Sequence, residues 1–186
     1  INDQYAQWNL DAFGTLETGS SLSLQQVLSL ENQFDVDLSG DGDIGLEFTP
    51  GINSIGSVNL GSTVFGYAIQ DGGNGPVQVQ YAGGFASQSN PGAGWEATAA
   101  VQNGDGYSLY WRNQINDQYA QWNLDAFGTL ETSSVRTEVE IINLENEYIA
   151  DLNGDSLVGL DFEPTDIVNN GVRFGQTAVG YALLDE

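Results

Sequence analysis

The chain has 186 residues, enough to bury a core as one domain or as two small ones. It carries 26 acidic residues against three arginines and no lysine, a formal net charge of -23, so we exclude nucleic acid and anionic membranes as partners. No cysteine is present for a disulfide, no apolar run is long enough to span a bilayer, and the 40% hydrophobic content indicates a globular fold.

An internal repeat dominates the organisation of the sequence. Residues 1–18 recur letter for letter at 115–132, an offset of 114 that holds without insertion to the end of the chain. We therefore interpret 1–72 as partial repeat unit A, 73–114 as a glycine-rich connector with a β-hairpin, and 115–186 as repeat unit B. The chain begins inside a repeat without a signal-peptide pattern, so we expect a processed piece of a longer polypeptide.

In the first half, the sequence predicts a strand over 3–10, a helix over 22–34 and a strand over 64–69. We expect Gln25, Gln26 and Glu31 on the solvent side of that helix. Residues 71–76 form a turn into a strand at 77–81, and 83–94 is a connector rich in glycine, serine and proline.

In the second half, strands at 95–101 and 107–112 flank the turn residues of 102–106, which indicates a hairpin. A third strand over 118–124 turns at 125–128 into 129–131, completing an antiparallel meander. The last elements are a helix over 136–149, capped by Ser133 or Ser134, and a strand over 178–184. The apolar positions that predict this helix are Val135, Val139, Ile142 and Ile149. The fold class is mainly β, with antiparallel meanders and hairpins and one short helix per repeat leading into a calcium loop.

Two short acidic segments follow the helices, DLSGDGDIG at 37–45 and DLNGDSLVG at 151–159. Oxygen-bearing side chains at alternate positions before a glycine are typical of loops that wrap a calcium ion. The candidate ligands are Asp37, Ser39, Asp41, Asp43 and Glu47 in the first copy, and Asp151, Asn153, Asp155 and Asp161 in the second. The ending departs from the EF-hand pattern, because the twelfth position is phenylalanine and the nearest acid comes one step earlier. The alternative reading is ordinary turn chemistry without a metal. We predict a structural Ca²⁺ that couples binding to folding.

The segments GPVQVQYAGG, GWEATAAVQNGDGYSLYWRN and QYAQWNLDAFGTL, with the Leu-Glu helix and the DLNGD loop, resemble a known family. It is the tryptophan-rich repeat, of the Synechocystis C-terminal type, found in large secreted and surface proteins of cyanobacteria and other bacteria. The resemblance covers about residues 56–159. It implies extracellular, calcium-rich arrays in adhesins and surface layers, and no settled catalytic activity.

The residues that are absent restrict the chemistry. Without histidine, cysteine or lysine, the chain cannot form the usual catalytic triads, Schiff bases or zinc sites, and we expect no enzyme. A pair of carboxylates, as in glycosidases, remains the catalytic alternative. Aromatic residues on the meander are candidates for stacking on sugar rings, although they also pack well in half-buried sheets. Alternation places Leu109 and Trp111 on one face and Tyr110 on the other, so we expect Tyr110 or Trp111 to be exposed.

These observations predict a secreted, calcium-stabilised structural repeat in a cell-surface fibre, layer or adhesin. The alternative is a lectin-like module that binds glycans through exposed tryptophan and tyrosine. The expected partners are neighbouring repeats or other chains that pair with an open strand edge at 3–10. Neither nucleic-acid binding nor membrane insertion is expected.

Overall fold

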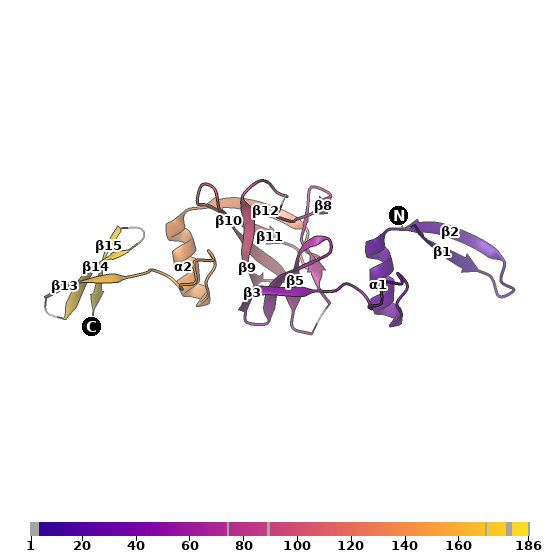
Figure 1. Cartoon of the computed structure of the whole chain (residues 1–186), viewed down its shortest axis with the longest axis horizontal. Helices are drawn as coiled ribbons and strands as arrows, with labels where there is room; N and C mark the ends of the chain where they lie inside the picture. Colours follow the sequence, from indigo (N-terminus) through magenta and orange to yellow (C-terminus); the bar gives the residue numbers. More distant parts are fainter. Residues whose placement is uncertain (1–3, 74, 89, 170, 178–179, 186) are drawn as a thin grey trace. The chain divides into compact units, whose positions relative to one another are not determined.

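The structure is a computed structural model that describes residues 4–73, 75–88, 90–169, 171–177 and 180–185. The chain divides into two compact units, Ile1–Phe48 and Thr49–Glu186. Figure 1 shows the elements of both along the chain. The repeat ranges 1–72, 73–114 and 115–186 concern the duplication of the sequence, and they stay a prediction.

The first unit contains a two-stranded hairpin, a helix and a loop. β1 (Tyr5–Leu10) pairs antiparallel with β2 (Leu16–Leu22), and α1 (Leu24–Phe34) follows. The Asp11 carboxylate closes the hairpin turn by accepting the backbone N–H groups of Phe13 and Thr15, each at 2.8 Å. Ser23 begins the helix with a capping box, which satisfies N–H groups that have no partner within the helix. Among the described residues, β1 pairs with β2 alone.

The second unit is built on a four-stranded antiparallel sheet in the order β12-β11-β10-β9. Its strands are β9 (Trp95–Asn103), β10 (Gly106–Asn113), β11 (Gln118–Leu124) and β12 (Leu130–Arg136). α2 (Glu138–Tyr148) follows β12 and contacts β11. Alternate side chains of these strands point to opposite faces, so the two central strands can contribute to a core on each side.

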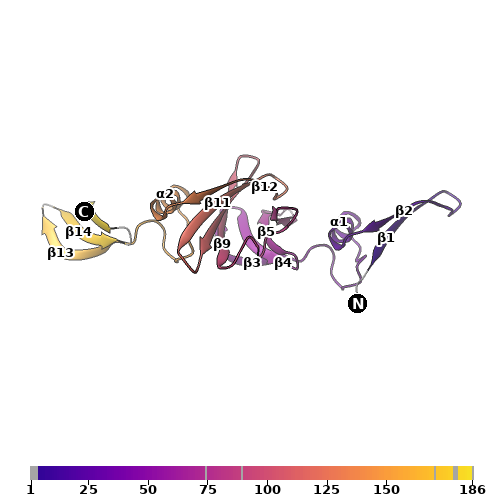
Figure 2. The ribbon, with the colours of Figure 1, turned by 90° about the horizontal axis from the view of Figure 1, so that it is seen from above.

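A second four-stranded sheet, in the order β3-β4-β5-β6, packs against β9 through β3 and β4 (Figure 2). Its strands are β3 (Thr49–Ile55), β4 (Val58–Thr63), β5 (Gly66–Asp71) and β6 (Val77–Gln78). A small hairpin joins β7 (Gln80–Tyr81) to β8 (Gly84–Phe85). A three-stranded sheet consists of β13 (Glu163–Asn169), β14 (Val172–Thr177) and β15 (Gly180–Asp185).

A β-bulge interrupts the pairing of β9 with β10. Tyr110 lies opposite Ala99, but the next residue, Trp111, lies opposite Ala97, so Thr98 is the extra residue. The Thr98 hydroxyl donates to the carbonyl oxygen of Leu152 at 2.5 Å. The bulge thus connects the edge strand of the sheet to the loop after α2.

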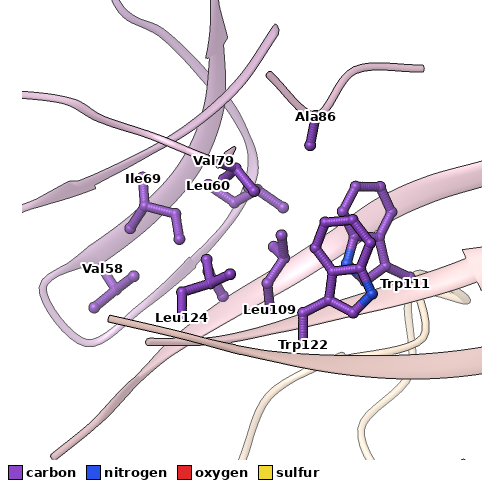
Figure 3. Packing of buried hydrophobic residues seen from close by; sticks show 10 residues of the cluster. Val58, Leu60, Ile69, Val79, Ala86, Leu109, Trp111, Trp122 and Leu124 are labelled. Carbon is purple, nitrogen blue, oxygen red and sulfur yellow. The ribbon is translucent and has the colours of Figure 1, made fainter. Parts of the chain in front are cut away.

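Two hydrophobic clusters lie on the two faces of the β9–β12 sheet. The first gathers residues of both four-stranded sheets around Trp111 and Trp122, whose ring centroids are 4.6 Å apart (Figure 3). The second places Tyr110 and Tyr119 against Ile141 of α2 and Leu152 of the following loop. Because both faces of β10 are covered, every residue of this strand is buried or partly buried.

The structure confirms a mainly β fold with antiparallel hairpins and two short helices. The predicted cap at Ser133 or Ser134 was wrong, because β12 includes both serines and Thr137 caps α2. The buried face of α2 consists of Ile141, Ile142 and Glu145. Of the predicted apolar set only Ile142 is buried, whereas Val135, Val139 and Ile149 are exposed.

Two predicted strand positions also change. The strand predicted at 64–69 is β5, which begins only at Gly66, after a turn that follows β4. Of the strand predicted at 178–184, residues 178–179 lie outside the described residues, and the remainder belongs to β15. The predicted connector at 83–94 includes β8 and contributes the fully buried Ala86 to the first cluster.

Candidate functional site

A buried carboxylate organises the loop after α2. Glu145 is fully buried at the last turn of the helix, and both of its oxygens accept backbone N–H groups from the loop. Oε1 accepts from Leu152 and Asn153, both at 3.1 Å, and Oε2 accepts from Gly159 at 3.0 Å. One side chain therefore fixes both ends of the acidic segment 151–159.

Glu31 has the same role after α1. Its carboxylate accepts the N–H groups of Leu38 at 3.0 Å, Ser39 at 2.6 Å and Gly45 at 2.8 Å. Desolvation acts to raise the pKa of both carboxyl groups, and the backbone hydrogen bonds act to lower it. Desolvation prevails at Glu145, whose pKa is raised, whereas the hydrogen bonds prevail at Glu31, whose pKa is lowered.

The first aspartate of each loop also turns toward the backbone. Asp37 accepts the N–H of Gly40 at 2.6 Å and of Gly42 at 3.0 Å, and the Gly40 hydrogen bond is the main reason why the pKa of Asp37 is lowered. Asp151 likewise accepts the N–H groups of Gly154 at 2.6 Å and Ser156 at 2.8 Å. These contacts give the two loops the same local fold despite their different sequences.

The other predicted ligands lie on the same loops or just beyond them. Asp41 accepts the N–H of Asp43 at 2.9 Å, and Asn153 accepts that of Asp155 at 2.8 Å. Glu47 and Asp161 are exposed, one residue before the end of each twelve-residue segment. In the described part of the chain, no three acidic side chains gather into a group that could hold a metal ion.

The donor types of these loops nevertheless fit calcium. Asp37, Ser39 and Asp41 offer carboxylate and hydroxyl oxygens, and Asp151, Asn153 and Asp155 offer carboxylate and amide oxygens. A hard cation such as Ca²⁺ prefers oxygen ligands of these kinds. A carboxylate oxygen that accepts one N–H keeps a second lone pair for a cation. Calcium binding therefore stays a prediction.

Sequence reasoning missed the two glutamates. Glu31 was predicted on the solvent side of its helix, and this was wrong, because its side chain is fully buried beneath the loop amides. A charged residue on a short amphipathic helix is normally solvated, so helical spacing alone gives no warning. The available signal was the recurrence of Leu-Glu-Asn at 30–32 and 144–146, immediately before each acidic loop.

The aromatic side chains of the β9–β12 sheet, which were among the candidates for sugar stacking, are buried or partly buried in its two clusters. Tyr110 and Trp111 are each 1% exposed, so the prediction that one of them faces solvent was wrong. Alternation assigned them correctly to opposite faces, but both faces of β10 are covered. Trp122 contacts Trp111 and Tyr81 and is also buried.

An open groove of about 1060 Å³ lies beside β3, β4 and β9. Its lining is mostly small or polar, with Phe65 and Tyr67 as its aromatic residues and Glu96 and Asp151 as its acids among the described positions. No helix within the described ranges is both long and apolar enough to cross a membrane.

The two copies of the 1–18 sequence differ sharply in their surroundings. Trp122 is 6% exposed in the core of the second unit, whereas the matching Trp8 in the first unit is 68% exposed. Leu124 and Leu10 show the same contrast, at 3% and 53%. The exposed apolar face of β1 is therefore a candidate interface.

Comparison with protein families matched residues 58–159 to the tryptophan-rich Synechocystis species C-terminal domain. The matched range begins at β4 and ends with the loop after α2, so it includes both hydrophobic clusters. Comparisons with curated proteins and with solved structures gave no match.

Proposed function

This chain belongs to the family of tryptophan-rich Synechocystis species C-terminal domains, and on that premise we propose that it is a structural repeat module of an extracellular assembly. Its role is mechanical: a tryptophan-bearing hairpin that its own unit leaves exposed is buried by a neighbouring repeat, within a fibre, layer or adhesin at the cell surface. Calcium stabilises the acidic loops.

One observation carries the proposal. Residues 1–18 and 115–132 are identical and build the same hairpin, which a capped helix and a carboxylate-held loop follow in both units. One copy completes a closed core, and the other leaves its tryptophan exposed. A repeat that cannot bury its apolar face alone and relies on its neighbour is typical of tandem arrays.

The proposed calcium sites use the loop residues described above. Asp37, Ser39 and Asp41 would hold one ion, and Asp151, Asn153 and Asp155 another, with Asp43, Glu47 and Asp161 as the nearest further acids. A bound cation would offset part of the repulsion that a net charge of -23 produces, and so favour the compact state. This role would suit the proposed extracellular location, since a chain without cysteine has no disulfide to stabilise it there.

The test is a thermal melt in calcium and in a chelator, followed by electron microscopy of the same sample. Calcium should raise the melting temperature more than magnesium at equal ionic strength, which controls for general screening of charge. The paired change Asp151→Asn with Asp155→Asn should remove part of that increase, whereas the exposed Glu131→Gln should leave it unchanged. Equal melting temperatures in calcium, in magnesium and in chelator would refute the calcium role. Uniformly monomeric particles in the electron microscope would count against assembly by the chain alone.

A further inference from the structure

We propose that the outer edge of β1 and the apolar face of unit Ile1–Phe48 bind a second copy of the segment 49–114, supplied by another repeat unit. The strand of that copy equivalent to β10 would add to β1 in the register that β10 has with β11. The inference rests on the proposed function and names the partner and the geometry that it leaves open.

The pairing of β10 with β11 supplies the template. Leu109 lies opposite Trp122, Tyr107 opposite Leu124 and Arg112 opposite Tyr119. Because residues 1–18 and 115–132 are identical, the same register places Leu109 of the added copy opposite Trp8, and Tyr107 opposite Leu10. A strand that fits β11 therefore fits β1 without any change of side chain along the shared edge.

Exposure identifies which part of the hairpin lacks a partner. Trp8 and Leu10 are exposed where their counterparts are buried, but Phe13 and Phe127 at the hairpin tips are both exposed, at 94% and 77%. The difference therefore lies along β1, whose counterpart β11 is covered by neighbouring segments, and not at the hairpin tip. A general loosening of the first hairpin would not produce this pattern.

A second surface of the same unit indicates the same partner. Leu152, in the loop after α2, is 1% exposed because it packs with Ala99 and Tyr110 from β9 and β10. Its counterpart Leu38 is 46% exposed, although Glu31 holds its loop in the same way. Both uncovered surfaces thus match residues of one segment, 95–113.

Polar contacts extend the match. In the second unit, Gln121 donates to the Ser108 hydroxyl at 3.0 Å, and that hydroxyl donates to Asn123 at 3.0 Å. The matching Gln7 and Asn9 are exposed, although Asn9 keeps its hydrogen bond to Thr18 at 2.9 Å, as Asn123 does to Thr132. A second Ser108 would restore this network.

The numbers of hairpins and acceptor segments explain why a second copy of the whole chain cannot cover every exposed hairpin. Each chain contains two hairpins of the β11 type, at 1–18 and 115–132, but a single acceptor segment, 49–114. Exchange of hairpins between two chains would therefore always leave one uncovered hairpin per chain. A further copy of the acceptor segment is the partner that removes the imbalance.

The test counts reactive thiols, since the chain contains no cysteine. The double variant Leu10→Cys/Leu124→Cys places one thiol on each hairpin. In the original chain, one thiol per molecule should react quickly with a thiol reagent at every protein concentration. An extended chain is then made, in which a second copy of 49–114 precedes Ile1 just as Gln114 precedes Ile115. Both of its thiols should react slowly, with the fast phase slowed at least about a hundredfold.

The control is the same extended chain with Leu109→Asp in the added copy alone, which should restore one fast thiol per molecule. One fast thiol remaining in the extended chain would overturn the proposal. So would protection of both thiols in the original chain at high concentration, because a whole second chain would then be the occupant. The thiol count of the original chain at high concentration tests the proposal even if the extended chain does not fold.

Repeating the count in calcium and in chelator separates the two proposals. Loss of the calcium effect on melting would leave the thiol count unchanged, whereas a failed thiol count would leave the melting result intact.

Discussion

The hairpin β1–β2 and the hairpin β11–β12 begin with the same residues and have very different surroundings. In each hairpin, the tryptophan of the first strand lies opposite a residue of the second strand. The same β-bulge then precedes the turn in both. Only β11 has β10 along its other edge, and its tryptophan is buried there. The comparison shows that the local sequence determines the hairpin, whereas the neighbouring strands determine whether it forms part of a core.

The largest expected effect is a difference between the two tryptophans. Trp122→Ala removes a side chain that contacts Trp111 and Tyr81, and should lower the free energy of unfolding by ~3–5 kcal/mol. Trp8→Ala removes an exposed side chain and should change it by less than ~0.5 kcal/mol. Urea denaturation followed by circular dichroism measures both. Equal losses would mean that the two hairpins share one environment in solution.

Substitution of the turn glycines should also destabilise the two hairpins to different extents. Gly14 and Gly128 both have positive φ, +81° and +78°, so either change to alanine should cost ~1–2 kcal/mol of backbone strain. At Gly128 a Cβ would also lie 2.2 Å from the carbonyl oxygen of Gln78, which should add ~1–3 kcal/mol. At Gly14 the same position is open. Thermal melts of the two variants compare them directly, and a greater loss for Gly14→Ala would contradict the packing around Gly128.

Glu145→Gln should loosen the loop 151–159. An amide nitrogen would replace one of the oxygens that accept backbone N–H groups, and an unsatisfied buried donor typically costs ~1–3 kcal/mol. Hydrogen exchange of the backbone amides in this loop should accelerate. Mass spectrometry measures the two loops separately, because the peptides of this loop differ in mass from those of 37–45. The control Glu147→Gln alters an exposed residue of the same helix and should leave exchange unchanged.

Acidity should affect the two glutamates in opposite directions. The pKa of Glu31 is lowered in the fold, so its contribution is present above the pKa of the unfolded chain and is lost as pH falls through the folded value. The pKa of Glu145 is raised, so its contribution is present below the unfolded pKa and is lost as pH rises through the folded value. Hydrogen exchange of each loop between pH 3 and 7 measures the difference, and parallel profiles would contradict it.

The smallest effect should be the same in both units. Ser23→Ala and Thr137→Ala each remove the side chain that begins a capping box, and each should cost ~1 kcal/mol. The caps depend only on residues within one turn. The cost of losing a cap should therefore not depend on β10, which pairs with β11 and has no counterpart beside β1. Loss of helical circular dichroism during unfolding checks both, and markedly unequal losses would show that the caps depend on their surroundings.

Sequence reasoning succeeded where short-range signals act and failed where distant segments meet. It placed the strand at 118–124 with the observed bounds, and both helices to within two residues. It missed β3 and β4, because Pro50, Gly51 and Gly61 obscure the alternation that marks a strand. It also missed the burial of Glu31 and Trp111, because nothing local to either residue specifies what covers it. The predicted calcium ligands lie on the two acidic loops, except Glu47 and Asp161 just beyond them, and their metal binding stays a prediction.

The extra residue in β9 has a consequence for how the tryptophans of the second unit come together. Beyond Thr98 the alternation of β9 changes phase, so Ala99 and Val101 face the helix side, whereas Ala97 and Trp95 face the same side as Trp111 and Trp122. If Thr98 were instead paired in a regular strand without a bulge, the strict alternation of β9 would turn Trp95 toward α2. The bulge at this threonine thereby keeps the indole rings of three strands on one side of the sheet.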